Sequence, residues 1–307
     1  MAPLNRFVDL LPEVADALGA NRPVVALEST VISHGMPYPA NLETARDLEA
    51  IVRAQGAVPA TIAVVDGRIR VGLSEADLTR LAGGQEPVRK LSRRDLAIGL
   101  VEGGLGATTV AATMIAASLA GIRVFATGGI GGVHRDAQAT FDISADIMEL
   151  ARTPVAVVCA GAKSILDLGL TLEALETHGV PVLGFRTDRF PAFYCRTSEF
   201  PVDTRVETPE DVARVCRTAW DLGLQGGIVV ANPVSDAHAM DPTEMERIIA
   251  TALEQAASVG VHGKSLTPFL LAKVNELTHG RSLATNQALI RDNAALAAAI
   301  SVALAGV

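Results

Sequence analysis

Two side chains in this sequence could act as an acid and as a nucleophile, and each comes after a short apolar run. Glu28 directly follows the run 24–27, and Lys163 follows the run 155–159 and the small residues 160–162. Short apolar runs bounded by turn signals are typical of buried strands. A carboxyl group at the tip of such a strand can have its pKa raised by burial, which suits a general acid. A surface glutamate or a helix cap is the plainer interpretation of Glu28 by itself.

Lys163 stands in an unusual place for a cation. We expect it at the N-terminus of the helix that follows the strand at 155–159. The helix dipole disfavours a cation there, and burial disfavours it further, so both effects would lower the pKa of the amine. A neutral lysine amine is a nucleophile that forms imines with carbonyl compounds. The alternative is a surface lysine whose ammonium group reaches the solvent.

A glycine-rich stretch follows another apolar run, at 124–126. It begins at Thr127, continues as Gly-Gly-Ile-Gly-Gly-Val and ends in His134 and Arg135. Backbone N–H groups in such a loop can bind the oxygens of a phosphate. Glycine-rich loops are common, and this one fits neither a Walker A loop nor the GxGxxG pattern. By itself the stretch is therefore weak evidence for a phosphate site.

Two carboxylates, Asp142 and Asp146, come next, where we expect a helix to begin. If both were helical, their spacing would put them on one face of the helix. Two acids placed in this way would suit a hard cation such as Mg²⁺ or Mn²⁺, with water completing its coordination. Acids that offset the helix dipole in a first turn are the commoner explanation.

Further polar groups could recognise an anion or a base. The segment 90–95, Lys-Leu-Ser-Arg-Arg-Asp, places three cations near a helix expected to begin at Ser92. An anion would be favoured there, although a solvated basic face explains the same pattern. Asn232 and Asn286 offer amides that could read a base or hydroxyl groups. An Asn-Pro pair after a strand, as at 232–233, is more often a turn.

The elements that would position these groups alternate between strands and helices. We expect strands at 24–27, 60–65, 68–73, 122–126, 155–159, 182–185 and 228–230, and helices at 39–55, after Ser74, from Ser92 and at 107–120. Asp66-Gly67 predicts a hairpin. Residues 243–307 read as all-helical, with Thr267 as a cap and Pro268 at the first helical position. This alternation predicts right-handed crossovers and a mixed, largely parallel sheet, which binds ligands beyond the carboxyl ends of its strands.

The composition fits an α/β protein and excludes several other classes. Hydrophobic residues make up 49% of the 307 residues and aromatic residues only 4%, so Ala, Val, Leu and Ile must form the core. This suits helices that cover a sheet on both faces. No linker or internal repeat divides the chain, so we expect one domain over 1–307. The net charge of -8 argues against a nucleic-acid groove, which would need a basic stripe.

The chain has features of a cytoplasmic protein. Its three cysteines, Cys159, Cys195 and Cys216, form no CxxC pair and indicate reduced thiols. The N-terminus lacks the pattern of a signal peptide. The apolar stretches near 107–122 and 294–307 contain small and polar residues and fall short of the roughly 20 apolar residues of a membrane span. We therefore expect no membrane association.

Long stretches of the sequence resemble the pseudouridine-5′-phosphate glycosidases, also described as the indigoidine synthase A-like family. The stretches are ALESTVISHGMPYPANLETA, GAVPATIAVVDGRIRVGL, KLSRRDLA, GATTVAATM, FATGGIGGVHR, FDISADIMEL, VCAGAKSILD, VVANPVSDAHAMD and SLATNQALIRDNAALAAAI. The resemblance runs from about residue 21 to near the end of the chain. The resemblance implies a three-layer α/β/α fold, a homotrimer and the reversible cleavage of pseudouridine 5′-phosphate to uracil and ribose 5-phosphate.

The resemblance also implies roles for individual residues. Glu28 would be the proton donor, Lys163 the nucleophile that forms a Schiff base with the opened ribose, and Asp142 the ligand of one Mn²⁺ per subunit. The residues implied in substrate binding are Lys90, Val110, Ser144, Ala145 and Asp146, with Asn286 at the base and Thr127 and His134 at the phosphate.

Two other functions share parts of this pattern. A Schiff-base aldolase or lyase acting on a phosphorylated sugar would use the same lysine and phosphate site without a uracil pocket. A sugar-phosphate sensor would bind the ligand and release no product. Competition by free uracil separates the aldolase from the glycosidase, and a search for product separates the sensor from both.

Overall fold

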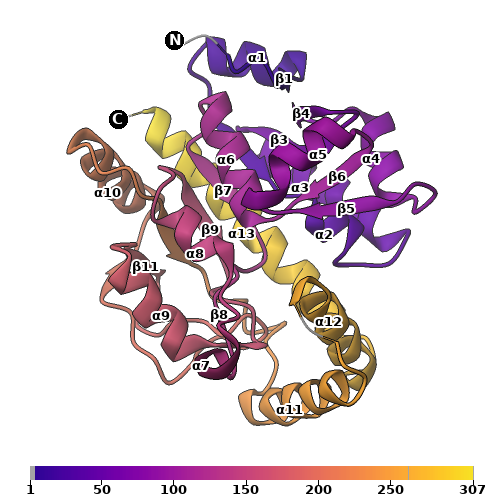
Figure 1. Cartoon of the computed structure of the whole chain (residues 1–307). Coiled ribbons are helices and arrows are strands. Elements are labelled where there is room, and N and C mark those ends of the chain that lie inside the picture. Colours follow the sequence, from indigo (N-terminus) through magenta and orange to yellow (C-terminus); the bar gives the residue numbers. More distant parts are fainter. Residues whose placement is uncertain (1–3, 262, 307) are drawn as a thin grey trace.

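The fold is built on a mixed, largely parallel sheet with helices on both faces (Figure 1). The computed structural model describes residues 4–261 and 263–306, apart from the side chain of Lys264. Residues 1–3, 262 and 307 of the expected domain therefore lie outside the described part. The strand order is β1-β4-β3-β2-β7-β9-β13-β11-β12, with β6 beside β3 and β5 beside β6. This confirms the predicted α/β fold class.

The strands are mostly short and buried. In chain order they are β1 Val8–Leu10, β2 Val24–Leu27, β3 Val58–Val65, β4 Arg68–Val71, β5 Val88–Leu91, β6 Leu105–Thr108, β7 Val124–Ala126, β8 Val133–His134, β9 Ala156–Cys159, β10 Leu166–Asp167, β11 Val182–Phe185, β12 Thr204–Val206 and β13 Ile228–Ala231. The antiparallel pairs in the main sheet are β3 with β4 and β3 with β6, and β8 and β10 form a separate small antiparallel pair.

The helices fall between the strands and then fill the C-terminal part of the chain. They are α1 Pro12–Gly19, α2 Thr30–Ser33, α3 Ala40–Ala54, α4 Glu75–Ala82, α5 Leu96–Glu102, α6 Val110–Ala120, α7 Ala137–Thr140, α8 Ala145–Leu150, α9 Leu168–Thr177, α10 Pro209–Asp221, α11 Pro242–Ser258, α12 Leu266–Leu277 and α13 Arg281–Ala305. The 3₁₀ turns η1 Arg93–Asp95 and η2 Gly263–Ser265 precede α5 and α12.

Most expected elements are confirmed, and the helix at 107–120 and the cap at Thr267 are wrong in detail. The hairpin at Asp66-Gly67 forms with both residues at positive φ, and the Ser74 hydroxyl caps α4. The helix expected at 107–120 begins later, because β6 continues through Thr108 and the Thr109 hydroxyl caps α6. The cap expected at Thr267 is also wrong, because α12 already begins at Leu266.

Long helix α13 is a central part of the hydrophobic core. It packs on β2, β7 and β9 and lies between α3 and α10, while α6 and α8 lie on the other face of the sheet (Figure 1). By length and composition alone α13 would be long and apolar enough to cross a membrane, although the apolar stretch near 294–307 was expected to fall short of that. More than half of its most apolar window is buried inside the protein, as in the core helix of a globular fold.

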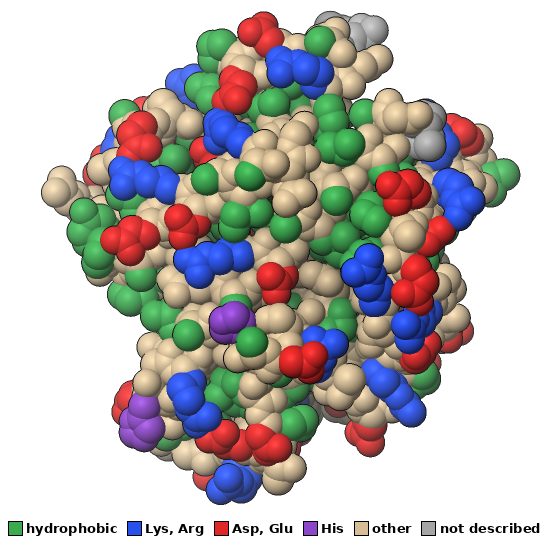
Figure 2. All heavy atoms as spheres, turned by 180° about the vertical axis from the view of Figure 1, so that it is seen from behind, with side chains coloured by type: hydrophobic (Ala, Val, Ile, Leu, Met, Phe, Trp, Pro, Cys, Tyr) green, Lys and Arg blue, Asp and Glu red, His purple; other side chains and the backbone are tan. Residues whose placement is uncertain are grey.

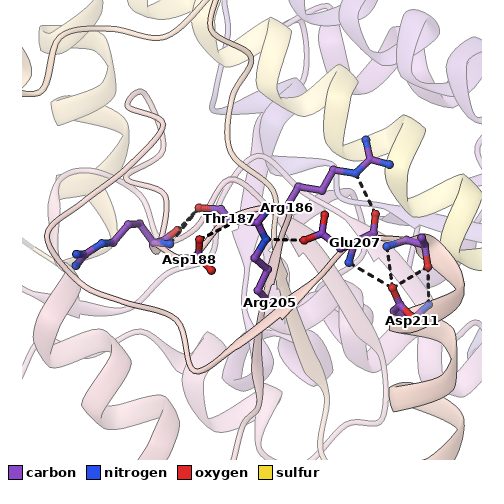
Figure 3. A network of polar contacts seen from close by, with 8 residues as sticks. Arg186, Thr187, Asp188, Arg205, Glu207 and Asp211 are labelled. Carbon is purple, nitrogen blue, oxygen red and sulfur yellow. Dashed lines mark hydrogen bonds and ion pairs between the residues drawn. The ribbon is translucent and has the colours of Figure 1, made fainter.

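Charged side chains on one face of the molecule are mixed rather than gathered by sign. On the face in Figure 2, lysine and arginine side chains lie among aspartates and glutamates. At the edge formed by β11 and β12, Arg205 pairs with Asp188 and Glu207, and Thr208 and Asp211 form a capping box at the start of α10 (Figure 3). These groups are exposed, so each ion pair contributes little stability. None of them lines the cavity described next.

Candidate active site

A cavity of about 860 Å³ opens at the carboxyl ends of the adjacent parallel strands β2, β7 and β9. This is the edge of the sheet at which the sequence predicted a ligand site. The cavity is lined by every predicted site residue: Glu28, Lys90, Val110, Thr127, His134, Asp142, Ser144, Ala145, Asp146, Lys163 and Asn286. The fold therefore brings together groups that are far apart in the sequence.

Glu28 is a buried acid with a hydroxyl partner on each carboxylate oxygen. Its side chain is only 7% exposed, and the hydroxyls of Thr30 and Thr127 donate to it. Thr127 reaches Glu28 because Leu27 and Ala126, the residues before them, are paired in register between β2 and β7. A hydroxyl can donate or accept, so these partners can serve both protonation states of the acid. The interpretation of Glu28 as a surface or capping residue is wrong.

A buried polar network fixes the chain next to Glu28. The Ser29 hydroxyl donates to the carbonyl oxygen of Ile62 at 2.7 Å and accepts from the backbone N–H of Thr108 at 2.9 Å. The Thr108 hydroxyl donates to the same Ile62 oxygen. The network ties the end of β2 to β3 and β6. It therefore holds Glu28 and the start of α6, where Val110 lies, on one rigid support.

Lys163 lies in a loop and points its amine at the backbone of the glycine-rich stretch. Its Nζ donates to the carbonyl oxygen of Gly129 at 2.6 Å. The next helix, α9, begins only at Leu168, and Asp167 is its cap. The expectation that Lys163 occupies a helix N-terminus is therefore wrong, because a turn and strand β10 come first. The half-buried amine faces the cavity, which disagrees with the alternative of a solvated surface lysine.

The glycine-rich stretch is packed against protein rather than open to an anion. The N–H groups of Ile130, Gly131, Val133 and His134 donate to Gly161 O, Asp146 Oδ2, Thr171 Oγ1 and Asp142 O. A Cβ added at Gly131 would lie 2.2 Å from Ser144 Oγ. Close packing thus explains this glycine better than phosphate binding does. The predicted nest of free backbone donors is wrong for this part of the loop.

The two neighbouring aspartates differ in role. Helix α8 begins at Ala145 with the Ser144 hydroxyl as its cap, so Asp142 precedes the helix and the predicted shared helix face is wrong. Asp146 is buried and accepts the backbone N–H groups of Ala111 at 2.9 Å and Gly131 at 2.8 Å. Asp146 therefore holds the walls of the cavity together. Asp142 is half-buried and lines the cavity, where it could bind a cation.

A cation at Asp142 would rely on few protein ligands. Among residues 4–261 and 263–306, no three His, Cys, Asp or Glu side chains gather as a metal cluster. Hydrated Mg²⁺-like cations are commonly held by one or two carboxylates together with substrate phosphate and water. The donor set around Asp142 fits that mode of binding and not a closed site built from protein alone.

Burial and nearby cations favour the neutral form of two histidines in the cavity. Burial lowers the pKa of His134, and the charges of Lys90 and Lys163 add to this effect while Asp142 opposes it. Burial also lowers the pKa of His34, together with the charge of Lys90. Neutral imidazoles can donate or accept single hydrogen bonds but bring no positive charge to a phosphate. Positive charge must therefore come from the lysines and arginines.

The remaining predicted polar groups divide into those that reach the cavity and those that do not. Arg93 and Arg94 line it, and Arg93 is held by an ion pair of 2.5 Å with the fully buried Glu149. Asn286 also lines it, whereas Asn232 instead donates to Asn293 and is not among the lining residues. The suggestion that Asn232 reads a ligand is wrong.

Several lining residues carried too weak a sequence signal to be assigned a role. They are Thr30, Val31, His34, Gly35, Thr109, Phe141, Ile143, Leu166, Phe193, Thr267, Pro268 and Leu271. His34 lies close to Glu28 in the chain, which could have marked it. Phe193 had no such signal, because it lies within the long loop between β11 and β12, eight residues beyond the end of the expected strand at 182–185.

Comparison with known proteins finds a matching family and relatives that align with nearly the whole chain. The sequence profile of the family described as "Indigoidine synthase A like protein" matches residues 13–303. A pseudouridine-5′-phosphate glycosidase of Hahella chejuensis is 58% identical over 298 residues, which cover 97% of this chain and 98% of that protein. A protein of the same name from Methylobacterium nodulans is 60% identical over 300 residues, which cover 98% of this chain and 89% of the relative.

Solved structures agree with the architecture. The prealnumycin C-glycosynthase AlnA, in complex with ribulose 5-phosphate, superposes with a TM-score of 0.91 at 40% identity and covers 98% of both chains. An indigoidine synthase A-like protein of Thermotoga maritima superposes with a TM-score of 0.88 at 36% identity and covers 97% of both chains.

The low pKa of His34 predicts how stability depends on pH. Because the folded-state pKa lies below the unfolded value of 6.5, the unfolded chain binds the proton first as the pH falls. The free energy of unfolding should therefore drop as the pH falls below 6.5, and His34→Gln should remove part of that drop. Urea unfolding of the wild type and of His34→Gln at pH 7.5 and at pH 5.5 measures this drop in the free energy of unfolding. An equal loss in the two proteins would contradict the assigned pKa direction.

Proposed function

Because this chain belongs to the indigoidine synthase A-like family, we propose that it is a pseudouridine-5′-phosphate glycosidase, which converts its substrate reversibly to uracil and ribose 5-phosphate. The observation that carries the proposal is that one cavity is lined by both the buried acid Glu28 and Lys163, with Lys90 and Asp142 also on its walls. Relatives that bear this enzyme name match the chain over nearly its full length. Their names support the substrate assignment.

The bond to be broken decides which groups are needed. Pseudouridine joins its base to ribose through carbon, so protonating a leaving oxygen, as two-carboxylate glycosidases do, is insufficient. The ribose ring must first open so that electrons can flow toward the base. In the proposed reaction the Lys163 amine forms a bond to the anomeric carbon as the ring C–O bond breaks. Glu28 gives its proton to the departing ring oxygen.

The second half of the reaction releases the two products. The nitrogen now attached to the sugar passes a proton to the Glu28 carboxylate, and its lone pair then forms a C=N bond while the bond between the anomeric carbon and uracil breaks. The electron pair goes to the uracil carbon, which then takes up a proton. Water hydrolyses the imine, and this returns the free lysine and gives ribose 5-phosphate. The reverse sequence makes a C-glycosidic bond, which agrees with a relative of this fold being a C-glycosynthase.

Binding groups divide between the base and the phosphate. We assign the base to the Asn286 amide, which can stabilise negative charge on the departing uracil. We assign the phosphate to Lys90, Thr127, His134 and the start of α8 at Ser144, Ala145 and Asp146, with Val110 as an apolar contact. Since the Asp146 side chain accepts two backbone N–H groups and its own N–H donates to the Ser144 hydroxyl, Asp146 shapes this wall and holds the start of α8 in place. Phosphate binding energy would hold the reacting carbon in place.

Asp142 is the carboxylate that would hold Mn²⁺, with water and substrate oxygens as the other ligands. When bound, the cation would neutralise phosphate charge and orient the substrate. The acid and nucleophile of the reaction remain side chains of this chain. We further propose that the protein is a homotrimer and that it works in the cytoplasm.

Release of uracil tests the function directly. The purified protein is incubated with pseudouridine 5′-phosphate and Mn²⁺, and uracil is followed by chromatography. We expect uracil with the phosphorylated substrate, and little or none with pseudouridine or after treatment with a chelator. Inhibition by added uracil is also expected, and it separates this enzyme from an aldolase. Absence of uracil, together with failure of uracil and ribose 5-phosphate to condense, would refute the proposal.

The two proposed catalytic residues should respond differently to substitution. Lys163→Ala removes the atom that forms the covalent bond, so uracil release should fall to the background rate. Glu28→Gln keeps the shape of the side chain and removes its proton, so kcat should fall by about 10²–10⁴-fold. Lys273→Ala, which breaks a surface pair with Glu276, is the control and should retain full activity. Wild-type turnover by Lys163→Ala would exclude this lysine as the nucleophile.

A further inference from the structure

One short backbone segment, Thr127–Gly129, contacts both proposed catalytic side chains. The Thr127 hydroxyl donates to Glu28, and the carbonyl oxygen of Gly129 accepts from Lys163 Nζ at 2.6 Å. Because these contacts are made by two residues of one three-residue segment, a shift of the segment moves the acid and the amine together. Whatever holds this segment in place therefore controls how the two groups face the substrate.

Asn293 on α13 holds the segment from behind. Its side chain is fully buried, and its Nδ2 donates to the carbonyl oxygens of Thr127 at 2.8 Å and Gly128 at 3.4 Å. Its Oδ1 accepts from Asn232 Nδ2 at 3.0 Å. An asparagine amide has two donor hydrogens and one acceptor oxygen, so each kind of group is used here. The bond from Asn232 also fixes which side of the amide faces the segment.

Phe193 packs against the same segment. A Cβ added at Gly129 would lie 2.6 Å from its ring, which leaves no room for the segment to move that way. Phe193 has a φ of 62°, a conformation that an aromatic residue rarely adopts. Its backbone N–H donates to the carbonyl oxygen of Ala160 at 3.0 Å, which helps to hold it there. Strained residues of this kind are found mainly at functional sites.

We propose that Asn293 is a positioning residue that sets the relative placement of Glu28 and Lys163 through the carbonyl groups of Thr127 and Gly128. It is not among the residues that line the cavity, so it acts through the segment rather than on the substrate. The inference rests on the proposed function, because it takes Glu28 and Lys163 to be the acid and the nucleophile. A polar side chain of the core helix α13 thus affects the rate of the reaction without touching the substrate.

A matched pair of substitutions on α13 separates positioning from stability. Asn293→Ala removes the bonds to Thr127 and Gly128, whereas Ser301→Ala removes a bond from the same helix to the carbonyl oxygen of Val24 at the start of β2. Both remove a buried hydrogen bond to backbone. We expect kcat for uracil release to fall about 10²-fold in Asn293→Ala with KM nearly unchanged, as for a reacting group displaced by about an ångström. Ser301→Ala should keep its kcat.

The isosteric substitution Asn293→Asp tests the donor function alone. An aspartate can still accept from Asn232 but offers oxygen instead of N–H to the carbonyl groups of Thr127 and Gly128. The kcat of Asn293→Asp should therefore stay as low as that of Asn293→Ala, although aspartate has the same shape as asparagine. If Asn293→Ala does not fold, Asn232→Ala removes only the bond that orients the amide, and its kcat should fall less but in the same direction. An unchanged kcat in the folded variants would overturn the proposal.

Chemical labelling of Lys163 gives a readout that does not need turnover. Each protein is treated briefly with acetic anhydride, and mass spectrometry compares the rate at Lys163 with that at Lys273. We expect the ratio to change several-fold in Asn293→Ala and to stay at the wild-type value in Ser301→Ala. If the wild type releases no uracil, the proposed function fails, and the labelling still tests the positioning. An unchanged ratio in Asn293→Ala would show that Asn293 is structural only.

Discussion

The parallel, in-register pairing of β2, β7 and β9 is the constraint on which the site depends. Leu27 pairs with Ala126, and Ala126 pairs with Val158, so these strands end at one edge of the sheet. The segments after them carry Glu28, Thr127 and Lys163 into one cavity. Parallel strands are covered on both faces, and helices α6 and α13 supply that cover here. The chemistry is thus placed by backbone hydrogen bonding and apolar burial, before any polar contact is considered.

Polar groups buried near this edge are costly unless they are paired, and the fold pairs those of Glu28, Asp146 and Asn293. Glu28 has two hydroxyl partners, Asp146 accepts two backbone N–H groups, and Asn293 uses both its oxygen and its nitrogen. These bonds connect the loops that form the walls to the rigid sheet and to α13. A site built in this way keeps its geometry without a ligand, which reduces the entropy that substrate binding must offset.

Apolar runs followed by polar residues mark strand ends, so the sequence allowed the strands at the cavity edge to be predicted, with Glu28, Thr127 and Lys163 after them. Lining positions such as Lys90 and Val110 were implied only by the resemblance to the family. The sequence alone does not reveal the contacts between segments that lie far apart in the chain. The loop between β9 and α9 contains a turn and a short strand, so Lys163 is not at a helix N-terminus as the sequence suggested. The packing of Gly131 against Ser144 and the bond from Asn232 to Asn293 likewise depend on chain pairings that one sequence does not reveal.

The central claim is that Lys163 bonds covalently to the sugar. The measurement that tests it most directly is reduction of the working enzyme with borohydride, followed by mass spectrometry of its peptides. We predict that an adduct with the mass of a reduced ribose 5-phosphate imine appears on the peptide that carries Lys163, and that it appears with either pseudouridine 5′-phosphate or ribose 5-phosphate. An adduct on Lys90 instead, or rapid uracil release with no adduct on any lysine, would contradict the account.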